Sequence, residues 1–158
     1  MQPIDKNFTP VEYDPQYILM VNQLKKYFPI KGGMVGKTVG QVKAVDGVTF
    51  NLKRGTTMGL VGESGCGKTT TGRTILRLSG EKTGGQVLFN GKEVYDLSAK
   101  EMRKMRTKMQ IIFQDPFSSL NPRYTVFELI ANPIRTFRLC RGKAETERKV
   151  FELMDTVG

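Results

Sequence analysis

The residues best suited to chemistry lie in one glycine-rich segment, where Gly62 is followed by four residues and then by Gly67, Lys68 and Thr69. This is the G-x-x-x-x-G-K-[ST] pattern of a loop that binds a nucleoside triphosphate. Glycines allow positive φ angles, so that successive backbone N–H groups can point at a phosphate. Lys68 would supply a full positive charge to the β and γ phosphates, and the Thr69 hydroxyl could ligate Mg²⁺. The pattern therefore predicts a site for a nucleoside triphosphate and Mg²⁺.

The expected nucleotide contacts come from this loop and from the start of the helix that should follow it. A helix beginning near Lys68 would add the partial positive charge of its N-terminus. Cys66 lies inside the loop, where a small space-filling side chain is the simpler interpretation than a reactive thiol. The predicted contact residues are Gly62, Ser64, Gly65, Cys66, Gly67, Lys68, Thr69 and Thr70.

A strand before the loop and a helix after it would hold these residues in place. Thr57–Val61 is apolar without polar alternation, which is typical of a strand buried on both faces. Met109–Phe113 is predicted to be a second such strand. Between them, Lys68–Ser79 is predicted to be helical, with Ile75 and Leu78 on the buried side. These elements indicate an α/β fold.

The rest of the first half predicts antiparallel strands. Asp46-Gly47 and Asn90-Gly91 each lie between short strand-like runs, as in tight hairpin turns. Residues 29–40 hold four glycines and a proline, which predict an irregular loop. The predicted strands are Tyr17–Phe28, Gln41–Val45, Val48–Lys53, Gln86–Phe89 and Glu93–Tyr95.

Three further helices are predicted in the second half. Ser98 with Glu101, and Thr125 with Glu128, have the spacing of a capping box at a helix N-terminus. Pro133 should kink or end the helix that Thr125 begins. The last helix, over about residues 143–157, places four apolar residues on one face at helical spacing: Val150, Leu153, Met154 and Val157.

The composition excludes several classes of site. The sequence contains no histidine, so histidine-based catalytic triads and imidazole metal sites are unavailable. Two cysteines are too few for a disulfide framework. No apolar run approaches the roughly 18 residues of a membrane-spanning helix, and the N-terminus does not have the pattern of a signal peptide. The net charge of +10 suits nucleic acid, an anionic membrane surface or simply solvated helix faces.

A second segment, from Gln114 to Val126, allows a family to be named. The stretches GESGCGKTT, QDPFSSLNPR and VKAVDGVTF resemble the ATP-binding subunits of oligopeptide and dipeptide importers, in the ATP-binding cassette (ABC) transporter family. The resemblance runs from about Tyr17 onward. It implies a P-loop NTPase core with an N-terminal antiparallel β subdomain and the start of a helical subdomain. The expected organisation is an irregular tail (1–16), a nucleotide-binding core (17–113), and the Q-loop with a partial helical subdomain (114–158).

The resemblance also implies roles for individual residues. Gln114 falls where the family places a glutamine near the Mg²⁺ and the attacking water, which makes Gln114 and Thr69 the expected metal contacts. Phe28 falls where the family places an aromatic ring under the adenine, although its neighbour Tyr27 could be the stacking residue instead.

The implied partners are membrane permease subunits, a second ATP-binding subunit and, indirectly, an extracellular peptide-binding protein. Permeases would dock at about residues 114–139, on the cytoplasmic face of the cell membrane, and no nucleic acid is expected. The family's signature, Walker B acidic residues and switch histidine are missing from this sequence. The chain is therefore expected to be an incomplete domain, the N-terminal half of the ATPase, and inactive in ATP hydrolysis on its own.

Two other functions are compatible with the sequence. A soluble ABC-type protein acting on ribosomes or nucleic acid would explain the charge of +10. A non-catalytic regulatory fragment would explain the missing motifs.

Overall fold

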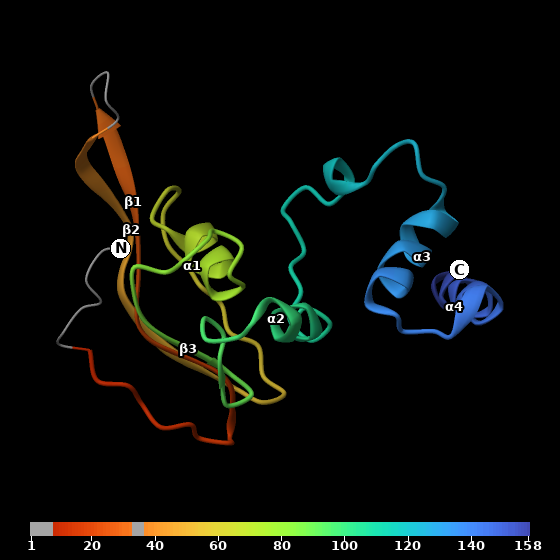
Figure 1. The fold of residues 1–158 in the computed structure, drawn as a ribbon, viewed down its shortest axis with the longest axis horizontal. Coiled ribbons are helices and arrows are strands. Elements are labelled where there is room, and N and C mark those ends of the chain that lie inside the picture. The colour runs from red at the N-terminus through yellow and green to blue at the C-terminus, as the bar shows by residue number, and fades with distance from the viewer. Residues whose placement is uncertain (1–7, 33–36) are drawn as a thin grey trace. The chain divides into compact units, whose positions relative to one another are not determined.

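The computed structural model describes residues 8–32 and 37–158, which form two compact units, Met1–Ser98 and Ala99–Gly158 (Figure 1). Across the described residues, every helix is too short or too polar to cross a membrane.

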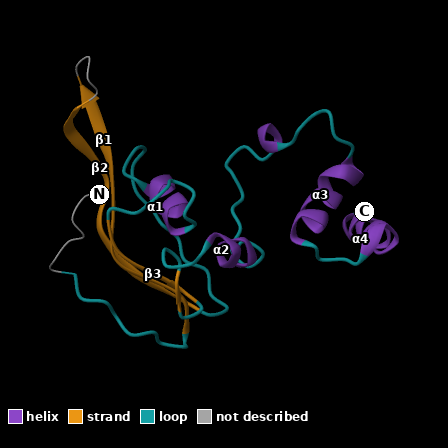
Figure 2. Cartoon of the chain, viewed as in Figure 1, coloured by secondary structure: helices purple, strands orange, loops and turns teal. Residues whose placement is uncertain are grey.

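The first unit is built on an antiparallel sheet with the strand order β2-β1-β3-β4. Its strands are β1 (Tyr17–Gly32), β2 (Lys37–Lys53), β3 (Gly84–Phe89) and β4 (Lys92–Glu93), and its helix is α1 (Lys68–Ile75). The long strands β1 and β2 curve together, and α1 lies beside the sheet (Figure 2). The most deeply buried apolar side chains of this unit come from β1, from β3 and from the residue after β4: Val21, Leu24, Val87 and Val94.

Asp46 and Gly47 lie inside β2, so the hairpin predicted there is wrong. β1 pairs with β2 on both sides of this point: Leu24 is opposite Val48 and Lys25 is opposite Asp46. Gly47 is left as an extra, unpaired residue with a φ of 79°, which glycine adopts readily. The Asp-Gly pair therefore marks a β-bulge in a continuous strand instead of a turn.

The loop predicted over residues 29–40 is also largely strand. β1 continues through Pro29 to Gly32, and β2 begins at Lys37. Ile30 lies opposite Gly40, so pairing along the hairpin overrides the local preference of glycine and proline for loops. Residues 33–36 lie outside the described part of the chain.

The second predicted hairpin is confirmed. β3 and β4 pair through Leu88 opposite Glu93, and Asn90 and Gly91 form the turn between them. Both turn residues have positive φ angles, 48° and 76°, as a type I′ turn requires.

α1 begins at Lys68 as predicted but ends at Ile75, earlier than expected. Arg77 takes a left-handed conformation with a φ of 53°, and the Leu78 N–H donates to the Arg73 carbonyl oxygen. This hydrogen bond is that of a Schellman motif, which turns the chain away from the helix axis. Ile75 is buried as predicted, whereas Leu78 is 42% exposed and the prediction for it is wrong.

The two strands predicted to be buried, Thr57–Val61 and Met109–Phe113, are not strands. Val61 is 91% exposed and Ile112 is 90% exposed, although Met109 is buried. An apolar run forms a buried strand only with a hydrogen-bonded neighbour and with cover on both faces. No strand of the described residues pairs with either segment. Both strand predictions are therefore wrong.

The second unit is helical, with α2 (Ala99–Met105), η1 (Phe117–Ser119), α3 (Val126–Phe137) and α4 (Gly142–Val157). The predicted capping box of α3 is confirmed. The Glu128 N–H donates to the Thr125 hydroxyl, and the Thr125 N–H donates to the Glu128 carboxylate. Pro133 lies inside α3, which continues to Phe137, so it does not end this helix.

α3 and α4 pack against each other through Ala131, Ile134 and Val150, which are buried. Met154 also packs against this cluster, as its place in the predicted apolar stripe requires. Leu153 and Val157, however, are 39% and 85% exposed. Only half of the predicted stripe is therefore used inside the unit.

A candidate nucleotide-binding site

The glycine-rich loop leads into α1, and its shape depends on glycine at position 67. Gly67 is the residue before the helix and has a φ of 97°. A Cβ atom at this position would overlap the carbonyl oxygen of Ala44 in β2. Ala44 is itself the extra residue of a bulge, because Lys26 pairs with Val45 and Tyr27 pairs with Lys43. The sheet and the loop therefore meet backbone to backbone at Gly67.

The Lys68 side chain folds back over the loop. Its ammonium group donates to the carbonyl oxygens of Gly62 and Glu63, at 2.7 and 2.6 Å, and lies 3.6 Å from the Cys66 sulfur. These contacts place a full positive charge beside the loop backbone. Because carbonyl oxygens and phosphate oxygens are both acceptors, a bound phosphate could replace one of these contacts without moving the charge far.

The first turn of α1 leaves backbone donors available. In the described structure, the N–H groups of Lys68, Thr69 and Thr70 donate no hydrogen bond, whereas the Thr71 N–H donates to the Gly67 carbonyl oxygen. Donors of this kind, reinforced by the helix dipole, favour an anion in front of the helix. Three of the predicted donors thus lie together at the N-terminus of α1, whereas the Cys66 N–H already donates to the Glu63 carbonyl oxygen.

The threonines of α1 divide into two groups. The Thr71 and Thr74 hydroxyls donate to carbonyl oxygens one turn earlier, Gly67 and Thr70, and both side chains are buried. Thr69 is exposed, and its hydroxyl forms no hydrogen bond in the described structure. Its position at the start of the helix leaves that oxygen able to ligate a cation, as the sequence predicts.

Cys66 is exposed, and its sulfur lies close to the backbone of Gly62. A Cβ atom at Gly62 would lie 2.7 Å from the Cys66 sulfur, so the small glycine at 62 makes room for the thiol. Ser64 and Gly65 form the exposed tip of the loop. Gly65 has a φ of 82° and no neighbour near its missing Cβ.

Phe28 and Tyr27 point to opposite faces of β1, because successive residues of a strand alternate. The Tyr27 hydroxyl donates to the Asp46 carboxylate, which lowers the pKa of Asp46. Phe28 shares its face with Lys26, whose ammonium lies 5.0 Å from the Phe28 ring centre and donates to the Glu81 carbonyl oxygen. Burial lowers the pKa of Lys26, and Glu81 opposes that shift.

Phe28 lies near the point where β2 meets the loop. Lys26, on the same face as Phe28, donates to the carbonyl oxygen of Glu81, which lies in the segment between α1 and β3. Phe28 lies opposite Val42, two residues along β2 from the Ala44 that touches Gly67. Two residues of strand span roughly 7 Å. The ring is 39% exposed and therefore accessible to a flat ligand.

Gln114 belongs to the second unit, where it lies exposed in the irregular segment between α2 and η1. The described residues contain no group of three or more His, Cys, Asp or Glu side chains that could hold a metal ion. Thr69 and Gln114 as metal ligands therefore remain predictions.

Sequence reasoning missed two residues of this site, Ala44 and Lys26. Ala44 contributes its carbonyl oxygen, whose position depends on a β-bulge. No pattern of side chains in the sequence predicts this bulge. A lysine is expected at the surface, but the Lys26 side chain is buried beside Phe28. Its alternation with Leu24 and Phe28 on one strand face was the available signal.

The model of the family described as "ABC transporter" matches residues 45–158. The chain is 50% identical over 142 residues to the oligopeptide transport ATP-binding protein AppF of Bacillus subtilis, covering 89% of this chain and 43% of AppF. It is 41% identical over 156 residues to the glutathione import ATP-binding protein GsiA of Escherichia coli K12, covering 99% of this chain and 24% of GsiA.

Among solved structures, the ATP-binding cassette MJ0796, a dimer in a post-hydrolysis state bound to ADP and Pi, superposes with a TM-score of 0.64 at 26% identity. That match covers 85% of this chain and 54% of MJ0796. The chain thus spans less than half the length of the curated relatives it matches.

Proposed function

Since this chain belongs to the ABC transporter family, we propose that it binds Mg-ATP through Gly62–Thr70 as part of an importer of oligopeptides or dipeptides. The observation that supports this most strongly is the Lys68 ammonium, held beside a loop whose helix presents unused N–H donors. The names of the relatives AppF and GsiA support peptide import as the transport function.

In the proposed complex, the triphosphate of ATP lies against the loop and the N-terminus of α1. The N–H groups of Lys68, Thr69 and Thr70 donate to its oxygens, and Lys68 neutralises charge on the β and γ phosphates. A bound Mg²⁺ would supply Lewis-acid chemistry at the γ phosphate. The Thr69 hydroxyl would be its ligand in this unit, and Gln114 would approach the metal and the attacking water from the second unit.

The adenine is proposed to stack on Phe28. Phe28 is exposed and pairs with Val42, two residues along β2 from the Ala44 that meets the loop at Gly67. Tyr27 lies on the other face, engaged with Asp46. The geometry therefore favours Phe28 over Tyr27 for the stacking role that the sequence left open.

The permease is proposed to dock on residues 114–139, with the protein peripheral at the cytoplasmic face of the membrane. This stretch exposes Phe117, Leu120 and Tyr124, large side chains of the kind that anchor protein interfaces. A second ATP-binding subunit would complete the ATP hydrolysis unit. The extracellular peptide-binding protein would act through the permease only.

Peptide uptake by cells tests the proposal. With the intact protein in its own cells, Lys68→Ala should abolish uptake of a labelled tripeptide, because the phosphate contact is lost. Lys92→Ala, at an exposed lysine of β4, should leave uptake unchanged. Normal uptake in the Lys68→Ala strain would overturn the importer assignment.

Photo-crosslinking identifies the partner. A photoreactive side chain at Ser119 should capture an integral membrane subunit, whereas one at Lys92 should not. Capture of ribosomal proteins from Ser119 would instead support the soluble ABC alternative.

A further inference from the structure

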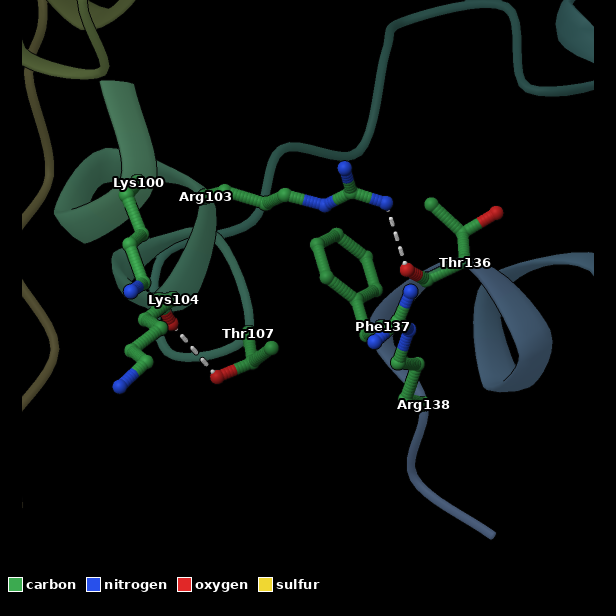
Figure 3. A pocket seen from close by; sticks show the side chains of 7 residues that line it. All are labelled: Lys100, Arg103, Lys104, Thr107, Thr136, Phe137 and Arg138. Atoms are coloured by element: carbon green, nitrogen blue, oxygen red, sulfur yellow. Dashed lines mark hydrogen bonds between the residues drawn. The ribbon is translucent and has the colours of Figure 1, made fainter. Parts of the chain in front are cut away.

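The second unit contains a basic pocket that the nucleotide site does not use (Figure 3). It has a volume of about 390 Å³. α2 and the following turn supply one wall, and the end of α3 supplies the other. The lining residues are Lys100, Arg103, Lys104, Thr107, Thr136, Phe137 and Arg138. Four of these seven are cations and none is an acid.

The cations of α2 share one face of the helix. Lys100, Arg103 and Lys104 are spaced i, i+3 and i+4, which makes them neighbours on the helix surface. The opposite side of α2 carries the buried residues Met102 and Met105. Like charges at i and i+4 repel each other and destabilise a helix, so the arrangement favours an anion that would relieve the repulsion.

Arg103 fixes the geometry of the pocket. Its guanidinium donates to the Thr136 carbonyl oxygen at 2.9 Å, at the C-terminal end of α3, beside the Phe137 ring (Figure 3). Arginine commonly caps a helix C-terminus in this way, so this bond accounts for Arg103 alone. Lys100, Lys104 and Arg138 form no ion pair in the described part of the chain, and their charges remain uncompensated.

Arg138 occupies a position that favours glycine. It ends α3 in a left-handed conformation with a φ of 53°, while the Leu139 N–H donates to the Ile134 carbonyl oxygen. Glycine is the usual residue at this point of a Schellman motif. An arginine held here despite the backbone strain directs a cation toward the pocket that α2 already lines.

We propose that this pocket binds a phosphate ester, with the phosphate held by Lys100, Lys104 and Arg138 and the attached group resting on Phe137. Three unpaired cations from two helices match the charge of a phosphate, and arginine and lysine are its usual partners. The half-buried Phe137 ring offers an apolar surface for the rest of the ligand. The phosphate belongs either to a small soluble ester or to a lipid headgroup.

Binding is measured in a chain that carries Lys68→Ala, so that the loop of the first unit does not contribute. Two probes distinguish the sources: inorganic pyrophosphate by calorimetry, and vesicles containing phosphatidylglycerol by co-flotation, with phosphatidylcholine vesicles as the reference. The expected result is saturable binding of one of the two probes. Pyrophosphate binding indicates a soluble phosphate compound as the ligand, and selective flotation with phosphatidylglycerol indicates a lipid headgroup.

Two variants at exposed positions assign that binding to the pocket. Lys100→Gln/Lys104→Gln removes two of the charges, and Arg138→Gly removes the third while supplying the residue that the backbone prefers. Each should weaken binding at least tenfold. The matched control, Lys31→Gln/Lys37→Gln, removes the same charge from exposed positions of β1 and β2 and should bind like the parent.

Absence of binding to both probes would overturn the proposal. Equal weakening by the pocket variants and the control would also overturn it, since that would indicate attraction to the overall charge of +10. Arg138→Gly should not unfold the chain, because glycine adopts the left-handed backbone conformation at this position without strain. Weaker binding by this variant therefore reports the lost charge.

Discussion

Gly67 shows how a single residue couples the sheet to the loop. Its left-handed backbone and its contact with the Ala44 carbonyl oxygen are both incompatible with a side chain. The motif predicts a glycine at this position because phosphate must come close to the backbone. The structure adds a second reason, which is that β2 already occupies the space.

Gly67→Ala should therefore destabilise the fold strongly. The left-handed conformation alone costs about 1 to 2 kcal/mol, and the clash with Ala44 adds to it, so the free energy of unfolding should fall by roughly 3 kcal/mol. Gly65→Ala is the matched control, since Gly65 has a similar φ but no atom within 4 Å of the added Cβ. Urea denaturation of both variants measures the difference, and equal losses would contradict the contact.

Phe28 and Tyr27 are separated by a second test at the residue scale. Phe28→Ala should weaken ATP binding by about 1 to 3 kcal/mol, the usual value of an aromatic stacked on a base. Binding of inorganic triphosphate, which has no base, should not change. Tyr27→Ala should affect neither ligand, and a loss of ATP affinity in Tyr27→Ala alone would reverse the assignment.

At the scale of elements, the sequence predicted the turns and helix ends that depend only on neighbouring residues. The capping box at Thr125, the Asn90-Gly91 turn and the start of α1 at Lys68 are all specified within a few residues, and all are confirmed. Asp46-Gly47 has an equally strong turn signal, but long-range pairing with β1 makes it a bulge. The end of α1 was missed because it depends on Arg77 adopting a conformation that arginine seldom takes.

The pairing of α3 with α4 can be tested with one substitution at two positions of α4. Val150 is fully buried against Ala131 and Ile134, whereas Val157 is 85% exposed. Val150→Ala should lower the free energy of unfolding of the second unit by roughly 2 kcal/mol, and Val157→Ala by less than about 0.5. Helix content followed by circular dichroism during denaturation reports both values. Similar effects at the two positions would show that α4 does not pack as described.

At the scale of the whole molecule, two apolar segments are exposed, although the sequence pattern assigns both to a buried sheet. Leu60, Val61 and Ile112 have the composition of core strands, but no strand pairs with their segments in the described structure. No local pattern could reveal this, because burial of a parallel strand depends on distant segments. The nucleotide loop, by contrast, is predicted from nine consecutive residues, and its binding of ATP stays a prediction.

This exposure should make the chain associate with itself. Ile112→Asp should shift the sedimentation of the chain toward the monomer, because a charge opposes burial of this segment between copies. Val39→Asp, at an apolar position of β2 that is 68% exposed, serves as the control and should change association less. A parent chain that remains monomeric at high concentration would contradict the expectation.

The most direct test of the account is calorimetric titration of the chain with Mg-ATP. Lys68→Ala should weaken binding by about 1.5 to 3 kcal/mol, roughly ten- to 150-fold, because a charged hydrogen bond to phosphate is removed. Lys92→Ala should leave the affinity unchanged, and chelation of Mg²⁺ should lower it in the parent chain. If Lys68→Ala binds Mg-ATP as tightly as the parent does, the loop is not the nucleotide site.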